Sequence, residues 1–165
     1  MLEPPAGAAV VPEGSIAPQS SRAPEAGSAP AAAAPVTNGK KVLLLEDDAS
    51  FKEIMQCFLA ENDFNVVAVQ NGVEGVHEVL ASDFEVILCD MLMPTLPGDM
   101  FFRAVERMRP HLCDRFIFMT GYRGNTKVNE FIAGVNGTVL TKPFHVDDLL
   151  ELIAFVELRT FLLAA

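Results

Sequence analysis

Five short apolar runs, separated by longer amphipathic stretches, constrain the fold of this chain more than any other feature. Each run has four or five residues, and most runs are apolar on both faces. This is typical of strands in a parallel sheet that helices cover on both sides. Strands that alternate with helices in this way form α/β folds. We therefore expect five strands, at 41–45, 65–69, 85–89, 115–119 and 138–141.

Five helical patterns accompany these strands. Ser50, with Glu53 three residues later, has the spacing of a capping box that opens the first helix. The alternation of five strands and five helices predicts an α/β fold with a doubly wound, five-stranded parallel sheet, the flavodoxin-like (βα)5 architecture. The other four helices are expected to begin at Asn71-Gly72, near Asp99, near 126 and at His145 to Asp148.

The first 39 residues differ in composition from the rest of the chain. Ala, Pro, Gly and Ser dominate them, so they cannot bury enough apolar surface to offset the entropy of ordering. We predict a disordered Ala/Pro-rich tail or linker over 1–39. A domain over 40–160 follows, and 161–165 form the C-terminal end of the last helix. The tail lacks the basic start and the apolar run of a signal peptide, and its apolar stretches are too short for a membrane span.

The charge and the cysteines narrow the function further. A formal net charge of −10, without clustered Lys and Arg, argues against nucleic acid as a partner. The scattered Cys57, Cys89 and Cys113 are typical of buried, reduced thiols, and we expect a cytoplasmic protein without a membrane contact.

Polar side chains follow four of the five runs. Glu46 and Asp47 follow the first run, Asp90 the third, Thr120 the fourth and Lys142 the fifth. Because the carboxyl ends of parallel strands gather at one edge of the sheet, we expect these side chains to converge. Crowded carboxylates favour a hard divalent cation such as Mg²⁺. An Asp in such a site can attack phosphorus while the metal, an ammonium and a hydroxyl stabilise the phosphoryl oxygens.

These motifs, in this order, resemble the receiver domain of bacterial two-component response regulators over residues 40 to about 160. The resemblance implies that Asp90 accepts a phosphoryl group from a histidine kinase, from a phosphotransfer protein or from a small phosphodonor. The motifs are Glu46-Asp47, the loop Asp90-x-x-Met93-Pro94-x-x-x-Gly98, Thr120-Gly121 and Lys142-Pro143-Phe144.

The resemblance also implies a role for each site residue. Glu46, Asp47 and Asp90 would hold Mg²⁺, together with the backbone carbonyl of Leu92. Thr120 and Lys142 would contact the phosphoryl oxygens. Asp48, the third acid of its run, would lie at the rim of the site.

The sequence departs from the receiver pattern at one position that bears on mechanism. Many receivers carry an aromatic residue three positions before the lysine, where this chain has Val139. The rotation of an aromatic ring therefore cannot report phosphorylation here. Leu92 and Tyr122, two positions after Asp90 and Thr120, carry no acid or amide to orient an attacking water. We hypothesise a long-lived phosphoryl group.

The last helix carries more apolar residues, over 149–163, than packing on one face requires. This excess indicates a surface for a downstream protein partner or for a homodimer, although a frayed helix end is an alternative.

We interpret the chain as a single-domain response regulator, which is a phosphoacceptor signalling domain rather than an enzyme. A receiver module of a hybrid kinase and a phosphorylation-independent binding module are alternatives. A hydrolase is disfavoured, because it would need a second acid where this chain has Leu92.

Overall fold

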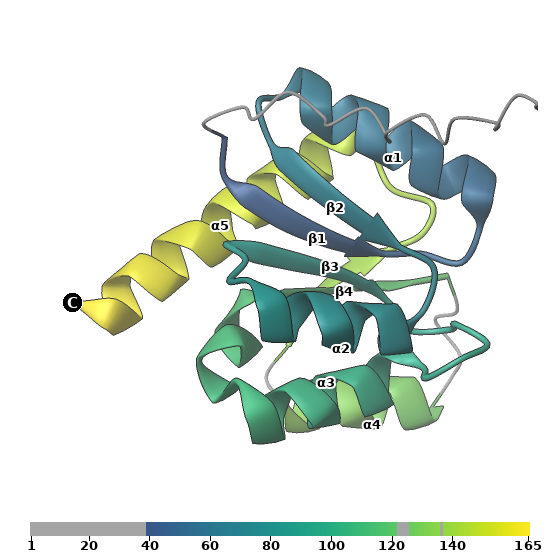
Figure 1. Cartoon of the computed structure of the whole chain (residues 1–165), viewed down its shortest axis with the longest axis vertical. Helices are drawn as coiled ribbons and strands as arrows, with labels where there is room; N and C mark the ends of the chain where they lie inside the picture. The colour runs from purple at the N-terminus through teal and green to yellow at the C-terminus, as the bar shows by residue number, and fades with distance from the viewer. Residues whose placement is uncertain (1–38, 122–125, 136) are drawn as a thin grey trace, which may run out of the picture. The chain divides into compact units, whose positions relative to one another are not determined.

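The five apolar runs form the five strands of one parallel sheet in the computed structural model, which describes residues 39–121, 126–135 and 137–165 (Figure 1). The strand order is β2-β1-β3-β4-β5, and all four neighbouring pairs are parallel. The predicted doubly wound, flavodoxin-like fold is confirmed. The strands are β1 (Lys41–Leu45), β2 (Asn65–Val69), β3 (Val86–Asp90), β4 (Phe116–Thr120) and β5 (Thr138–Thr141).

Helices cover both faces of this sheet, as the apolar character of the strands requires. Successive residues of a strand point to opposite faces, so Leu43 packs in one hydrophobic cluster and Leu44 in the other. The cluster around Leu43 contains residues of α2, α3 and α4, and the cluster around Leu44 contains residues of α1 and α5. The helices are α1 (Ala49–Glu61), α2 (Gly72–Ala81), α3 (Gly98–Met108), the 3₁₀ helix η1 (Pro110–Arg115), α4 (Thr126–Gly134) and α5 (Val146–Ala164).

Two strands lie one residue further along the chain than predicted. β3 includes Asp90, which pairs with Met119, and β4 includes Thr120, which pairs with Thr141. The ladder continues beyond these strands, because the amide of Lys142 donates to the carbonyl of Thr120 at 2.8 Å. Asp90 and Thr120 are therefore held by the sheet itself.

The predicted capping box of the first helix is wrong. Asp48 is the N-cap of α1, and its side chain accepts a hydrogen bond from the amide of Phe51 at 2.9 Å. Ser50 lies within the first turn. The predicted starts of the later helices are confirmed at Asn71, which caps α2, and at His145, which caps α5.

Two sequence-based predictions concern residues outside the described ranges. These are the tail, apart from Gly39, and Tyr122. None of the helices in the described ranges has the length and apolar content that crossing a bilayer requires.

The three free cysteines differ in burial. Cys89 is buried and Cys113 is half-buried, but Cys57 is exposed, so the expectation of burial is wrong for Cys57. Burial raises the pKa of the Cys113 thiol to about 11, and the nearby carboxylate of Glu106 adds to this shift.

This pKa predicts an unusual pH profile for the alkylation of Cys113 in a Cys57→Ser variant. Because the thiolate is the reactive form, the alkylation rate should rise about tenfold per pH unit. The rise should continue well beyond pH 8.5, where an unperturbed thiol levels off, because the pKa of Cys113 is about 11. Mass spectrometry of iodoacetamide-treated protein measures the rate, and a plateau below about pH 9 would contradict this burial.

Candidate functional site

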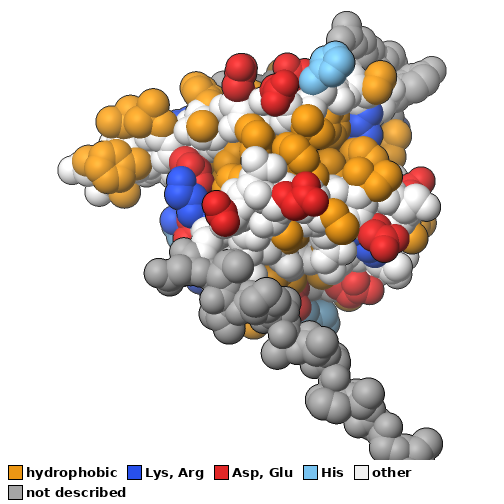
Figure 2. Space-filling view, turned by 90° about the horizontal axis from the view of Figure 1, so that it is seen from above, with side chains coloured by type: hydrophobic (Ala, Val, Ile, Leu, Met, Phe, Trp, Pro, Cys, Tyr) orange, Lys and Arg blue, Asp and Glu red, His pale blue; other side chains and the backbone are white. Residues whose placement is uncertain are grey.

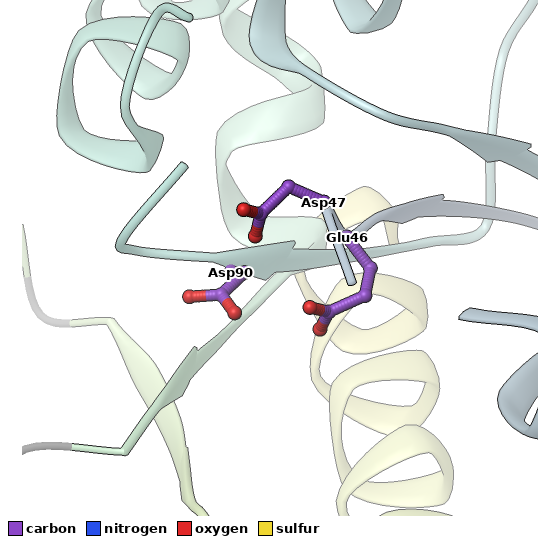
Figure 3. Close-up of side chains that lie close together, drawn as sticks. All are labelled: Glu46, Asp47 and Asp90. Atoms are coloured by element: carbon purple, nitrogen blue, oxygen red, sulfur yellow. The ribbon is translucent and has the colours of Figure 1, made fainter. Parts of the chain in front are cut away.

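Three carboxylates meet at the carboxyl edge of the sheet, as the sequence predicts. Glu46 directly follows β1, and Asp90 ends the adjacent strand β3. Glu46, Asp47 and Asp90 each offer an oxygen within 4.8 Å of those of the other two, and Figure 3 shows the three groups pointing toward one another. Glu46 is 1% exposed and Asp90 is 8% exposed, whereas Asp47 is open to solvent. The site thus has a buried base and an accessible rim.

Lys142 bridges the two buried carboxylates. Its Nζ donates to Glu46 Oε2 and to Asp90 Oδ2, each at 2.6 Å. Lys142 follows β5, which lies two strands away from β3 in the sheet. Its ammonium also lies 4.6 Å from the ring centroid of Phe51, a residue of α1. A cation over an aromatic face is stabilised by the ring quadrupole, so Phe51 helps to hold the ammonium in place.

The loop after β3 contacts the other oxygen of Asp90. The amide of Leu92 donates to Asp90 Oδ1 at 2.8 Å, so the two carboxylate oxygens have different partners. Gly98 begins α3 beside this loop, and a Cβ added to it would lie 2.6 Å from the carbonyl oxygen of Asp90. A side chain at position 98 would therefore push the start of α3 away from the site.

Thr120 completes the edge between Asp90 and Lys142. It is the last residue of β4, which lies between β3 and β5, and it is 4% exposed. The structure thus brings Thr120 to the same edge as the other predicted residues. Asp48 is exposed and caps α1, which is consistent with a position at the rim.

The charges of the site shift the pKa of two groups. Burial raises the pKa of Glu46, and the hydrogen bond from Lys142 opposes this shift only in part. Burial alone would lower the pKa of Lys142, but its hydrogen bonds to Asp90 and Glu46 outweigh burial, so the pKa is raised. Lys142 therefore stays an ammonium near neutral pH.

The donor set fits a hard divalent cation. Three carboxylates face a single ammonium, so negative charge remains in excess, and the raised pKa of Glu46 reflects the cost of burying it. All three groups are oxygen donors, and Mg²⁺ is held by oxygen ligands at partly hydrated sites. Binding of the cation by the backbone carbonyl of Leu92 stays a prediction.

Phe51 is the site residue that the sequence-based interpretation missed. Phe51 lies in the first turns of α1 and packs beside Phe144, with 6.0 Å between the ring centroids. Its second contact, with Lys142, depends on how α1 sits over the end of β5, which periodicity does not report.

Comparisons with known proteins agree with this geometry. Residues 42–154 match the family described as "Response regulator receiver domain". The response regulator receiver protein CpdR of Brucella abortus (strain 2308) is 28% identical over 126 residues, which cover 76% of this chain and 99% of CpdR. The cell cycle transcriptional regulator CtrA of Caulobacter vibrioides is 31% identical over 120 residues, which cover 73% of this chain and 51% of CtrA. This chain thus spans about half the length of CtrA.

Solved structures show the same fold. The receiver domain protein from Methanospirillum hungatei JF-1 superposes with a TM-score of 0.68 at 22% identity, and the match covers 74% of this chain and 96% of that one. The fold and the site define an α/β signalling domain with an acidic, lysine-bridged pocket at the carboxyl edge of its sheet. The chain belongs to the response regulator receiver domain family of two-component signalling.

The lysine bridge predicts a large loss of stability in Lys142→Met. This change leaves two buried carboxylates without their shared counter-charge, which typically costs about 3 kcal/mol or more. Urea denaturation in EDTA measures the free energy of unfolding. Lys127→Met, at an exposed position of α4, is the matched control and should change it by less than about 0.5 kcal/mol. Equal stability of the two variants would contradict the bridge.

Proposed function

We propose that this chain is a phosphorylation switch in which Asp90 accepts a phosphoryl group from the phosphohistidine of a histidine kinase or phosphotransfer protein. The observation that carries the proposal is the pair of 2.6 Å hydrogen bonds from Lys142 to Asp90 and Glu46, beside a third carboxylate. This is the charge arrangement that phosphoryl transfer to a carboxylate requires.

The chemistry follows from the partners of Asp90. A carboxylate oxygen of Asp90 forms a bond to phosphorus, the bond between phosphorus and the imidazole nitrogen breaks, and the imidazole keeps the electron pair. Lys142 then donates to a phosphoryl oxygen in place of a carboxylate oxygen, and the hydroxyl of Thr120 donates to another. Glu46, Asp47, Asp90 and the Leu92 carbonyl would hold Mg²⁺, which would supply positive charge beside the phosphoryl oxygens.

The signal passes to a protein rather than to nucleic acid. The net charge of −10 opposes a phosphate backbone as a partner. The apolar surface of α5 is the region that we propose for such contacts, because large apolar side chains there stay exposed.

Phosphorylation is not signalled from β5 by the rotation of an aromatic ring, because Val139 stands at that position. Val139 is half-buried and lies beside a hollow of about 240 Å³, which is also lined by Asn129, Ile132, Ala133 and Gly137. A β-branched residue has few side-chain rotamers. We propose that movement of Thr120 reaches the surface through α4 and its packing on β5.

A phosphodonor assay tests the proposed function. With acetyl phosphate or phosphoramidate and Mg²⁺, the protein should gain one acid-stable, base-labile phosphoryl group, measured by intact-mass spectrometry. Asp90→Asn should abolish the adduct. Asp48→Asn is the matched control, because Asn also caps a helix well, and it should keep the adduct.

The result of the phosphodonor assay distinguishes the proposed function from its alternatives. An absent adduct in the folded wild-type protein would favour a phosphorylation-independent binding module. An adduct that persists in Asp90→Asn would place the acceptor elsewhere.

The lifetime of the adduct gives a separate prediction. Leu92 is 52% exposed beside Asp90 and cannot orient a water for attack. We expect a half-life of minutes or longer in Mg²⁺, followed by the loss of the phosphoryl mass. Leu92→Asn should shorten it, whereas Leu92→Ala removes the same bulk without adding an amide and should shorten it less. A wild-type half-life of seconds would contradict the hypothesis.

A further inference from the structure

The first turn of α1 brings an aromatic ring to the acidic pocket. Phe51 is half-buried, and its ring centroid lies 4.6 Å from the Nζ of Lys142. Figure 2 looks onto the face of the domain that α1 covers, where hydrophobic side chains gather among charged ones. Phe51 and Phe144 pack against the apolar cluster beneath α1, and their rings meet edge to face. Apolar packing thus holds the ring that contacts the ammonium.

Four contacts join Phe51 to the site in a closed circuit. Glu46 Oε1 accepts a hydrogen bond from the amide of Asp48 at 3.3 Å. Asp48 Oδ1 accepts from the amide of Phe51 at 2.9 Å, and the Phe51 ring lies against the Lys142 ammonium. Lys142 in turn donates to the other oxygen of Glu46, at 2.6 Å. The circuit ties the position of the ring to the position of the ammonium, because both are fixed to Glu46.

The contacts between Lys142 and the carboxylates change during phosphoryl transfer, whereas its contact with the ring need not. The Lys142 side chain is 22% exposed, so the ammonium can also turn toward water. In the resting site, hydrogen bonds to Glu46 and Asp90 hold it. Once an oxygen of Asp90 is bonded to phosphorus, Asp90 is no longer a charged acceptor. A contact that remains at that stage keeps the ammonium beside the phosphoryl oxygens while charge develops on them.

Only an aromatic side chain provides such a contact at position 51. The face of an aromatic ring is negative, and a cation within about 6 Å of the centroid is attracted to it. An aliphatic side chain of similar size would pack beside Phe144 but would not attract a cation. For a pair that is partly exposed, the attraction corresponds to roughly a two- to fivefold change in a rate or an equilibrium.

We propose that Phe51 is a positioning residue for phosphoryl transfer, whose ring keeps the Lys142 ammonium at the pocket while its acceptor changes from the Asp90 carboxylate to a phosphoryl oxygen. The proposal rests on the proposed function, since it concerns the same reaction. Phe51 acts through Lys142 and contacts no reacting atom. The electron density of the ring, rather than its size, therefore affects the rate.

Stepwise fluorination of the ring at position 51 tests this role. Fluorine withdraws electron density from the ring face with little change in shape, so each fluorine weakens the attraction to a cation. The rate of phosphoryl gain from phosphoramidate with Mg²⁺, measured by intact-mass spectrometry, should fall stepwise from phenylalanine to its mono-, di- and trifluorinated forms. The total decrease should be about two- to fivefold. Phe51→Leu should be as slow as the trifluorinated form, and Phe51→Tyr should stay close to the wild type.

Fluorination of Phe58 is the matched control. Phe58 is also a half-buried residue of α1 that packs against the same apolar cluster, and its fluorination should leave the rate unchanged. A rate that does not depend on fluorination at position 51, in a protein that gains the adduct, would overturn the positioning role and leave the proposed function standing. A wild-type protein that gains no adduct would overturn both.

Urea denaturation in EDTA provides a measurement that needs no phosphodonor. The trifluorinated ring at position 51 should lower the urea midpoint of the protein. It should lower the midpoint less in a Lys142→Met background, because the cation is then absent and the two changes are not additive. Equal decreases in the two backgrounds would refute the contact between ring and ammonium on which the proposal depends.

Discussion

The ammonium of Lys142 between the carboxylates of Glu46 and Asp90 is the interaction on which the site depends. It joins the ends of β1, β3 and β5, so it exists only if the sheet has the order that brings these ends together. Two carboxylates that are almost fully buried would strongly oppose folding without this counter-charge. The bridge thus holds in place a site whose buried charges would otherwise oppose folding.

Much of this arrangement follows from sequence pattern alone. Apolar runs located every strand to within a residue. The rule that ligands bind at the carboxyl edge of such sheets predicts that Asp90 and Lys142 meet there. The errors have a common physical cause. Whether Asp48 or Ser50 caps α1, and whether β3 ends before or at Asp90, depends on where hydrogen bonding between neighbouring strands stops. That is a property of the assembled sheet, and local propensity does not encode it.

Val139 bears on how the state of the site could be signalled, and not on the groups that surround Asp90. The predicted site residues lie together around Asp90, yet the strand that leads to Lys142 carries the aliphatic side chain of Val139. The space beside Val139 is bounded by α4 and by Gly137, where an added Cβ would lie 2.5 Å from the ring of Phe118. This crowding fixes the backbone just before β5 against the aromatic core.

The two ends of α5 lie in different surroundings, although they belong to one helix. Its first turn is held beside the site, because His145 caps the helix only three residues after Lys142. Its last turns lie roughly 25 Å away along the helix axis. There Phe161, Leu162 and Leu163 are exposed. Under the proposed function, a small displacement of Lys142 toward a phosphoryl group would be transmitted along this unbroken helix to its exposed end. Since the inner residues Leu149, Ile153 and Val156 are buried on the sheet, the helix would move with β5 rather than bend.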